Sequence, residues 1–161
     1  VAGLLDVLVD PANSPMQTGL ASWGLSFVGA KAPEALREAA QSSDARIRTA
    51  AIGALGDQIQ NLNDQEARQL LQNGLNDEDE EVRAEATTLM GKLNDSNWAV
   101  PLVLPNLRDG SPLVRKNAAL SLMKLEDAAV IPELERCAAD EADSAVAPIL
   151  RLAISQLSRD D

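Results

Sequence analysis

One segment recurs along the chain, and this repeat limits the possible fold more than any other feature. Each copy begins in a polar turn and reaches an Ile or Val, which we call the anchor. Apolar residues follow at most of the positions four and eight residues later. That spacing places the apolar side chains on one face of an α-helix. The anchors are Ile47, Val82, Val114 and Val146, spaced by 35, 32 and 32 residues, with a fainter copy at Met16.

A second helix precedes each anchor helix, because another apolar residue lies eleven or twelve positions before every anchor. These residues are Leu5, Leu36, Leu71, Val103 and Leu134. The predicted leading helices cover residues 1–10, 33–42, 64–76, 97–108 and 128–139. The predicted second helices cover residues 15–29, 45–57, 79–93, 111–124 and 144–158. We therefore predict an all-α solenoid of about five helix pairs in a single domain, 1–161, with repeats at about 1–30, 31–62, 63–95, 96–125 and 126–161.

The motif within the copies carries a family resemblance. In the second copy Asp44 is followed by Ile47-Arg48, by Ala50-Ala51 and by Ala54-Leu55-Gly56. This pattern resembles the HEAT repeat, and particularly the HEAT-like repeat of the phycobilisome-lyase type, over residues 30–158. The resemblance implies a right-handed superhelix in which the second helices line a concave face.

The resemblance also implies a ladder of Asp and Arg side chains between neighbouring repeats, which should stop at Ala147. A row of ligand-binding arginines is the alternative interpretation of the same residues. The ladder residues would be Asp44, Arg48, Asp79, Arg83, Asp109 and Arg115.

The composition argues against several classes of partner. The net charge is -11, and the 14 Lys and Arg residues are spread along the whole length, so we expect no binding to nucleic acid or to an anionic membrane surface. No apolar run reaches the roughly 18 residues of a membrane span, and no signal-peptide pattern opens the chain. We expect a cytoplasmic protein. The start at Val1 rather than Met indicates a processed or cut chain.

Catalytic and metal sites are not expected. The chain has no His, no Tyr and one Cys, which leaves few groups for zinc binding or for general acid–base chemistry. The acidic run 77–81 lacks the Gly and the final Glu of an EF-hand calcium loop. It is typical of the N-terminus of a helix, where the helix dipole stabilises acidic side chains. We therefore predict no catalytic residue, no metal and no cofactor. Cys137 is expected to be a buried packing residue, and a thiol that captures an electrophile is the alternative.

The predicted partner surface lies on the concave face, where residues two, six and nine positions after each anchor point away from the core. These residues are small in the second and third copies and become mostly apolar in the last two. Such a patch favours partner binding, although Leu120 and Leu152 could instead fill contacts between repeats. The acidic chain favours a basic or neutral protein partner. The predicted partner-binding residues are Lys116, Leu120, Met123 and Leu152.

Three functions remain in competition. The first is a non-catalytic scaffold or adaptor that binds another protein through the concave face. The second, implied by the resemblance, is a subunit of a phycobilin lyase or a phycobilisome chromophore-detaching factor, whose partner would be a phycobiliprotein. The third, a helical-repeat DNA glycosylase, is disfavoured by the charge and by the aromatic content of 2%.

Overall fold

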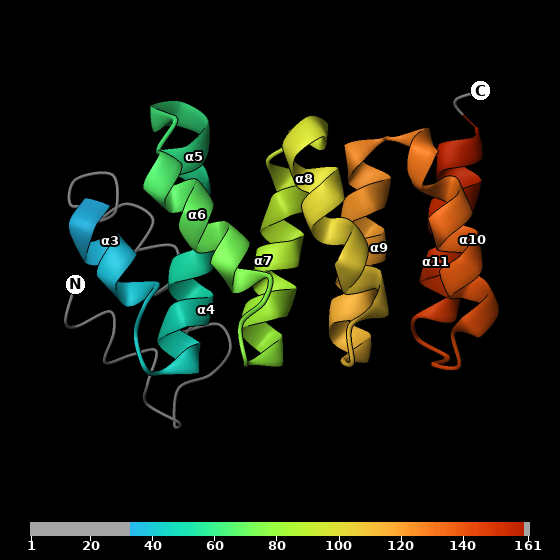
Figure 1. The fold of residues 1–161 in the computed structure, drawn as a ribbon, viewed down its shortest axis with the longest axis horizontal. Coiled ribbons are helices and arrows are strands. Elements are labelled where there is room, and N and C mark those ends of the chain that lie inside the picture. Colours follow the sequence, from blue (N-terminus) through green and yellow to red (C-terminus); the bar gives the residue numbers. More distant parts are fainter. Residues whose placement is uncertain (1–32, 160–161) are drawn as a thin grey trace. The chain divides into compact units, whose positions relative to one another are not determined.

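The computed structural model describes residues 33–159, and Figure 1 shows a succession of helices along this part of the chain. No strand interrupts residues 33–159, so the predicted fold class, an all-α solenoid of helix pairs, is confirmed. The first predicted pair, 1–10 and 15–29, lies outside the described residues. The elements are α3 (Pro33–Ala39), α4 (Ala45–Gly53), α5 (Gly56–Leu62), α6 (Gln65–Gly74), α7 (Glu80–Lys92), α8 (Ser96–Val103), η1 (Leu104–Arg108), α9 (Pro112–Leu125), η2 (Ala128–Val130), α10 (Ile131–Asp140) and α11 (Ala147–Ser158).

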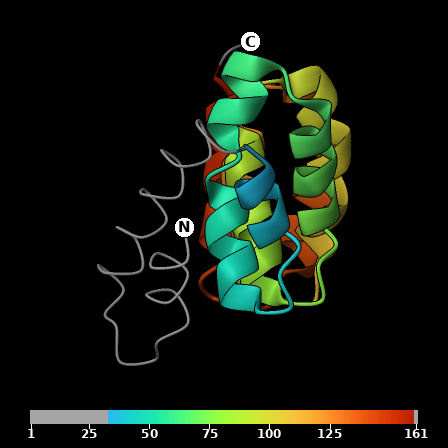
Figure 2. The ribbon, with the colours of Figure 1, turned by 90° about the vertical axis from the view of Figure 1, so that its left-hand side faces the viewer.

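Two compact units divide the chain, with a boundary inside α7 after Ala86. In the N-terminal unit α3 packs on α4, and α6 packs on α4 and α5; Figure 2 shows α6 (green) beside α4 and α5 (teal). In the C-terminal unit α8 and η1 pack on α9, and α11 packs on both α9 and α10. Each unit thus contains leading and second helices in contact.

The repeat positions form the core, as the periodicity predicts. The leading-helix residues Leu36, Leu71, Val103 and Leu134 are at most 1% exposed. Three of the four described anchors are equally buried, and Ile47 is half-buried. The residues four and eight positions after the anchors are buried as well, apart from the half-buried Ile154. Hydrophobic burial on two facing helix stripes therefore holds each pair together.

Glycine and proline explain where the helices depart from the predicted bounds. The predicted helix 45–57 is broken between α4 and α5, next to Gly53 and Gly56, which are poor helix formers. The predicted helix 97–108 turns from α8 into the 3₁₀ helix η1 where Pro105 lacks the N–H of an α-helical hydrogen bond. The predicted helix 144–158 begins later, at Ala147, with Pro148 in the first turn of α11.

Close packing overturns part of the predicted concave surface. The helical phase predicts that Gly91 faces the groove, yet Gly91 is buried, and a Cβ added there would lie 2.8 Å from the Cα of Ser121. The Ser121 hydroxyl donates a hydrogen bond of 2.6 Å to the carbonyl oxygen of Thr87. Ala84, another predicted surface residue, is only 4% exposed. The nine-residue offset in the third copy therefore serves helix packing, because a glycine there lets the end of α7 approach α9 closely.

Candidate protein interface on α9 and α11

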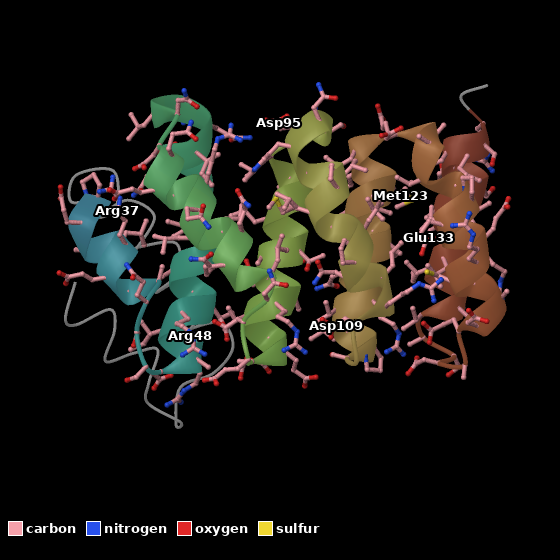
Figure 3. All side chains as sticks on the ribbon, viewed as in Figure 1. Arg37, Arg48, Asp95, Asp109, Met123 and Glu133 are labelled. Carbon is pink, nitrogen blue, oxygen red and sulfur yellow. The ribbon has the colours of Figure 1, made fainter. Side chains whose placement is uncertain are left out.

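The four predicted partner-binding residues lie on the two second helices of the C-terminal unit. Lys116, Leu120 and Met123 are on α9 and are half-buried, and Figure 3 labels Met123 on this helix. Leu152, on the neighbouring α11, is 43% exposed. This exposure leaves part of the Leu152 side chain accessible to a partner.

A groove of about 400 Å³ brings Met123 and Leu152 together. Its lining combines apolar side chains with two cations and one carboxylate, a mixture that suits a protein partner more than a purely apolar cofactor. Lys116 and Leu120 do not line the groove itself. The lining residues are Met123, Lys124, Glu126, Leu152, Gln156, Leu157 and Arg159.

Two of the arginines that follow an anchor, Arg48 and Arg115, each link two turns between helices. The Arg48 side chain (Figure 3) donates two hydrogen bonds of 2.9 Å to the Asp77 carboxylate, 29 residues later, and one of 3.0 Å to the Ser42 carbonyl oxygen. Arg115 repeats this pattern with the Glu141 carboxylate and the Asp109 carbonyl oxygen. The arginines are thereby held by two turns at once.

These pairs shift the pKa of each carboxyl in the same direction. For Asp77, burial alone would raise the pKa, but the hydrogen bonds from Arg48 and from the Asp79 N–H bring it below its ordinary value. For Glu141, the hydrogen bonds from Arg115 lower the pKa more strongly than burial raises it. Both carboxylates are therefore charged and satisfied in the folded protein, and their partners Arg48 and Arg115 have raised pKa values for the same reason.

The predicted ladder aspartates have a local role that the repeat motif does not reveal. The Asp44 and Asp79 carboxylates accept hydrogen bonds from backbone N–H groups at the starts of their own helices. The Asp109 carboxylate accepts one from the Ser111 N–H. Arg83 donates to the carbonyl oxygens of Asp77 and Glu78.

Asp77 and Glu141, which the arginines contact, are not among the residues predicted from the repeat motif. A signal for them exists, because both lie five positions before an anchor, as do Ser42 and Asp109. At all four positions the side chain accepts a hydrogen bond from the N–H two residues later.

Cys137 lies at a second hollow of the C-terminal unit, of about 540 Å³, lined by Arg108, Arg115 and four carboxylates. The thiol is 5% exposed, and its sulfur lies 3.8 Å from the Glu133 carboxylate. Burial raises the pKa of the Cys137 thiol, while the Arg108 guanidinium acts in the opposite direction. The thiolate is disfavoured, so the geometry fits a packing residue and not an activated nucleophile.

Metal-binding clusters and membrane-spanning helices are both absent from the described part of the chain. Among residues 33–159 no group of three or more Cys, Asp and Glu side chains is arranged to hold a metal ion. None of the described helices is both long and apolar enough to span a membrane.

The repeats also match a known family. Its sequence model, described as HEAT repeats, matches residues 1–87, 33–107 and 69–155 in overlapping registers. The chain belongs to the HEAT-repeat family. The matches span most of the chain, so membership accounts for both units and not for one helix pair alone.

A curated relative shares more than the repeat. The chain is 37% identical over 156 residues to the bilin biosynthesis protein MpeU of Synechococcus sp. (strain WH8020). The aligned region is 97% of this chain and 52% of MpeU, so the chain spans about half the length of this relative.

Solved structures show the same fold at lower identity. The complex of CpcE and CpcF of phycocyanin lyase from Nostoc sp. PCC7120 contains a chain with a TM-score of 0.71 and 21% identity, covering 94% of this chain and 98% of that one. Human deoxyhypusine hydroxylase has a TM-score of 0.52 and 18% identity, covering 97% of this chain and 73% of that one. The predicted resemblance to HEAT-like repeats of the phycobilisome-lyase type is confirmed by these matches together with MpeU.

Proposed function

We propose that this HEAT-repeat chain works in bilin attachment or removal on a phycobiliprotein, as part of a lyase-type assembly. The observation that carries the proposal is the identity of 37% to a bilin biosynthesis protein across 97% of the chain. This similarity favours the hypothesis over a scaffold without a role in bilin chemistry. The phycocyanin lyase of similar fold is a complex of two proteins, CpcE and CpcF, which supports work with a second subunit.

The geometry supports a holding role for the chain. Its one thiol, Cys137, is buried and has a raised pKa, so it is poorly suited to carry a bilin. The groove on α9 and α11 instead offers exposed apolar and charged side chains to a protein. We propose that this face, with Lys116, Leu120, Met123 and Leu152, contacts the phycobiliprotein.

Co-expression in a bilin-producing bacterium tests the proposal. An acceptor phycobiliprotein subunit is produced with or without this chain, each time in the presence and absence of a second HEAT-repeat lyase subunit. Bilin fluorescence on a denaturing gel then measures the covalently attached chromophore. A parallel sample starts from the acceptor already carrying its bilin. We expect the chain to increase attachment or to cause release, and an unchanged bilin content in every combination would contradict the proposal.

Matched leucine variants test the location of the contact. Leu152→Asp places a charge in the groove, whereas Leu113→Asp changes a leucine of similar exposure, 38% against 43%, that does not line it. We expect Leu152→Asp to reduce binding to the acceptor at least tenfold while the helical circular dichroism is retained. Equal binding of the acceptor by both variants would show that the contact lies outside the groove.

A further inference from the structure

Positive charge is segregated onto the helices that carry the groove. The helices α9 and α11 contain no Asp or Glu, although the chain has 25 acidic residues and a net charge of -11. Their charged residues are all cations. They are Arg115, Lys116, Lys124 and Arg151, with Arg159 following at the end of α11.

Two of these cations, Lys124 and Arg159, line the groove. Lys116 lies beyond its lining on α9, eight residues before Lys124 and roughly 80° around the helix from it. Eight residues of α-helix extend about 12 Å. Within residues 33–159, no ion pair joins Lys116, Lys124 or Arg159 to a carboxylate, even though Glu126 also lines the groove. The stripe therefore has a net positive charge available to a partner. The sequence continues with Asp160 and Asp161, which lie outside the described residues.

Most other cations of the described chain are already neutralised. Six arginines form ion pairs: Arg37, Arg46, Arg48, Arg108, Arg115 and Arg136. Apart from Lys92 on α7, the described cations without an ion pair lie on α9, on α11 or directly after α11.

Helix dipoles explain only part of this pattern. A cation near a helix C-terminus is favoured by the dipole, which accounts for Lys124 and Arg159. Lys116 is the fifth residue of α9 and lies beyond the first turn, so the dipole has little influence on it. The same dipole favours acids in the first turn, as in α6 and α7, but the first turns of α4, α8, α9 and α11 have none. The dipole therefore accounts for Lys124 and Arg159 and leaves Lys116 unexplained.

We propose that the groove binds an acidic segment of a partner protein. Apolar side chains of that segment would pack on Met123 and Leu152, and its carboxylates would pair with Lys116, Lys124 and Arg159. This is the arrangement by which an amphipathic helix lies in a groove between two helices. The inference rests on the proposed function in taking the groove as the partner site. It reverses the expectation of a basic or neutral partner, which was drawn from the charge of the whole chain.

The elongated form of the stripe favours a protein segment over a small molecule. Small-molecule sites enclose most of the ligand surface, whereas Leu152 is 43% exposed and the cations are spread along the stripe. The net charge of the chain opposes an acidic partner at long range. That field is screened beyond about 8 Å at physiological salt, so the cations in direct contact decide the preference.

A pair of synthetic peptides tests the charge preference. Both form an amphipathic helix with the same leucine face, flanked by Glu in the acidic peptide and by Lys in the basic one. Fluorescence anisotropy with the full chain at physiological salt measures their binding. We expect the acidic peptide to bind at least tenfold more tightly, against the direction that a net charge of -11 would impose. Binding of the basic peptide with equal or greater affinity, or of neither peptide, would overturn the proposal.

Charge-reversal variants locate the binding. The Lys124→Glu, Arg159→Glu double variant should bind the acidic peptide about tenfold or more weakly than the wild type, and it should bind the basic peptide more tightly. Lys92→Glu, a reversal of an exposed lysine on α7 outside the groove, serves as the control and should change neither. Circular dichroism checks that both variants fold. An unchanged preference in the groove variant would place the binding elsewhere and refute the inference.

A free bilin provides the competing outcome. Biliverdin is titrated into the complex of the chain with the acidic peptide. If it displaces the peptide and the groove variant abolishes its absorbance shift, the groove is a small-molecule site and the inference is wrong. The peptide assay needs neither a phycobiliprotein nor a bilin. Its failure would therefore leave the chromophore function standing, and a failed chromophore assay would leave the charge preference standing.

Discussion

The Arg115 guanidinium and the Glu141 carboxylate face each other across 26 residues of sequence, joined by N–H···O hydrogen bonds of 2.8 and 3.0 Å. The Glu141 side chain is only 6% exposed and that of Arg115 19%, so water competes poorly for either partner. Such bidentate pairs are among the stronger interactions available to a helical turn.

Removing one member of this pair should destabilise the protein. We expect Arg115→Ala to lower the free energy of unfolding by roughly 1–3 kcal/mol, because the Glu141 carboxylate loses its charged partner in a part-buried site. Urea unfolding followed by circular dichroism measures the change. Arg136→Ala is the control, since Arg136 is 66% exposed and pairs with Glu133 on the surface. A similar small effect of both variants would show that the Arg115 pair contributes no more than a surface pair.

The same pair predicts a dependence of stability on pH. The folded pKa of Glu141 lies below its ordinary value of 4.5. Its contribution is therefore complete above pH 4.5 and disappears as the pH falls through the folded pKa. The difference in unfolding free energy between the wild type and Glu141→Gln should shrink as urea titrations are repeated at decreasing pH below 4.5. A difference that stays constant would contradict the assignment. Glu135→Gln, an exposed change on α10, the helix that ends just before Glu141, controls for the loss of one negative charge.

Two glycines of the C-terminal unit should respond differently to the same substitution. A Cβ at Gly91 would meet the backbone and side chain of Ser121 at 2.8–2.9 Å, whereas one at Gly110 would meet nothing within 4 Å. We expect Gly91→Ala to cost about 1–3 kcal/mol of stability, because the end of α7 and α9 would have to move apart. Gly110→Ala should change stability by less than about 0.5 kcal/mol. Thermal unfolding of both variants measures the contrast, and equal melting temperatures would argue against the close approach.

Cys137 should react slowly in the folded protein. Burial and the raised pKa leave little thiolate at neutral pH. We expect a thiol reagent such as DTNB to react with the native chain much more slowly than with the chain in urea. Cys137→Ala should leave bilin attachment or removal intact in the co-expression assay. Rapid native labelling, or loss of that activity in a folded variant, would give the thiol a chemical role.

The periodicity alone predicts much of the fold. Apolar residues at a helical spacing define which face of a helix is buried, and this property is local in sequence. The spacing accordingly predicts that Leu36, Leu71, Val103 and Leu134 lie in the core, and each is buried. The bounds of the helices follow less closely from the spacing, because prolines such as Pro105 and glycines such as Gly53 act on the backbone without changing the apolar pattern.

The surface does not follow from the repeat in the same way. Gly91 and Met123 share an offset of nine residues from their anchors, yet Gly91 is buried beside Ser121 and Met123 lines a groove. Likewise the repeat marks Arg115 and the position of Glu141, five residues before an anchor, but it does not show that these two side chains pair. The sequence by itself determined the helices and their buried stripes, because these depend on local spacing. Only the tertiary structure decided which remaining side chains meet and which stay exposed, because that depends on how closely neighbouring helices approach.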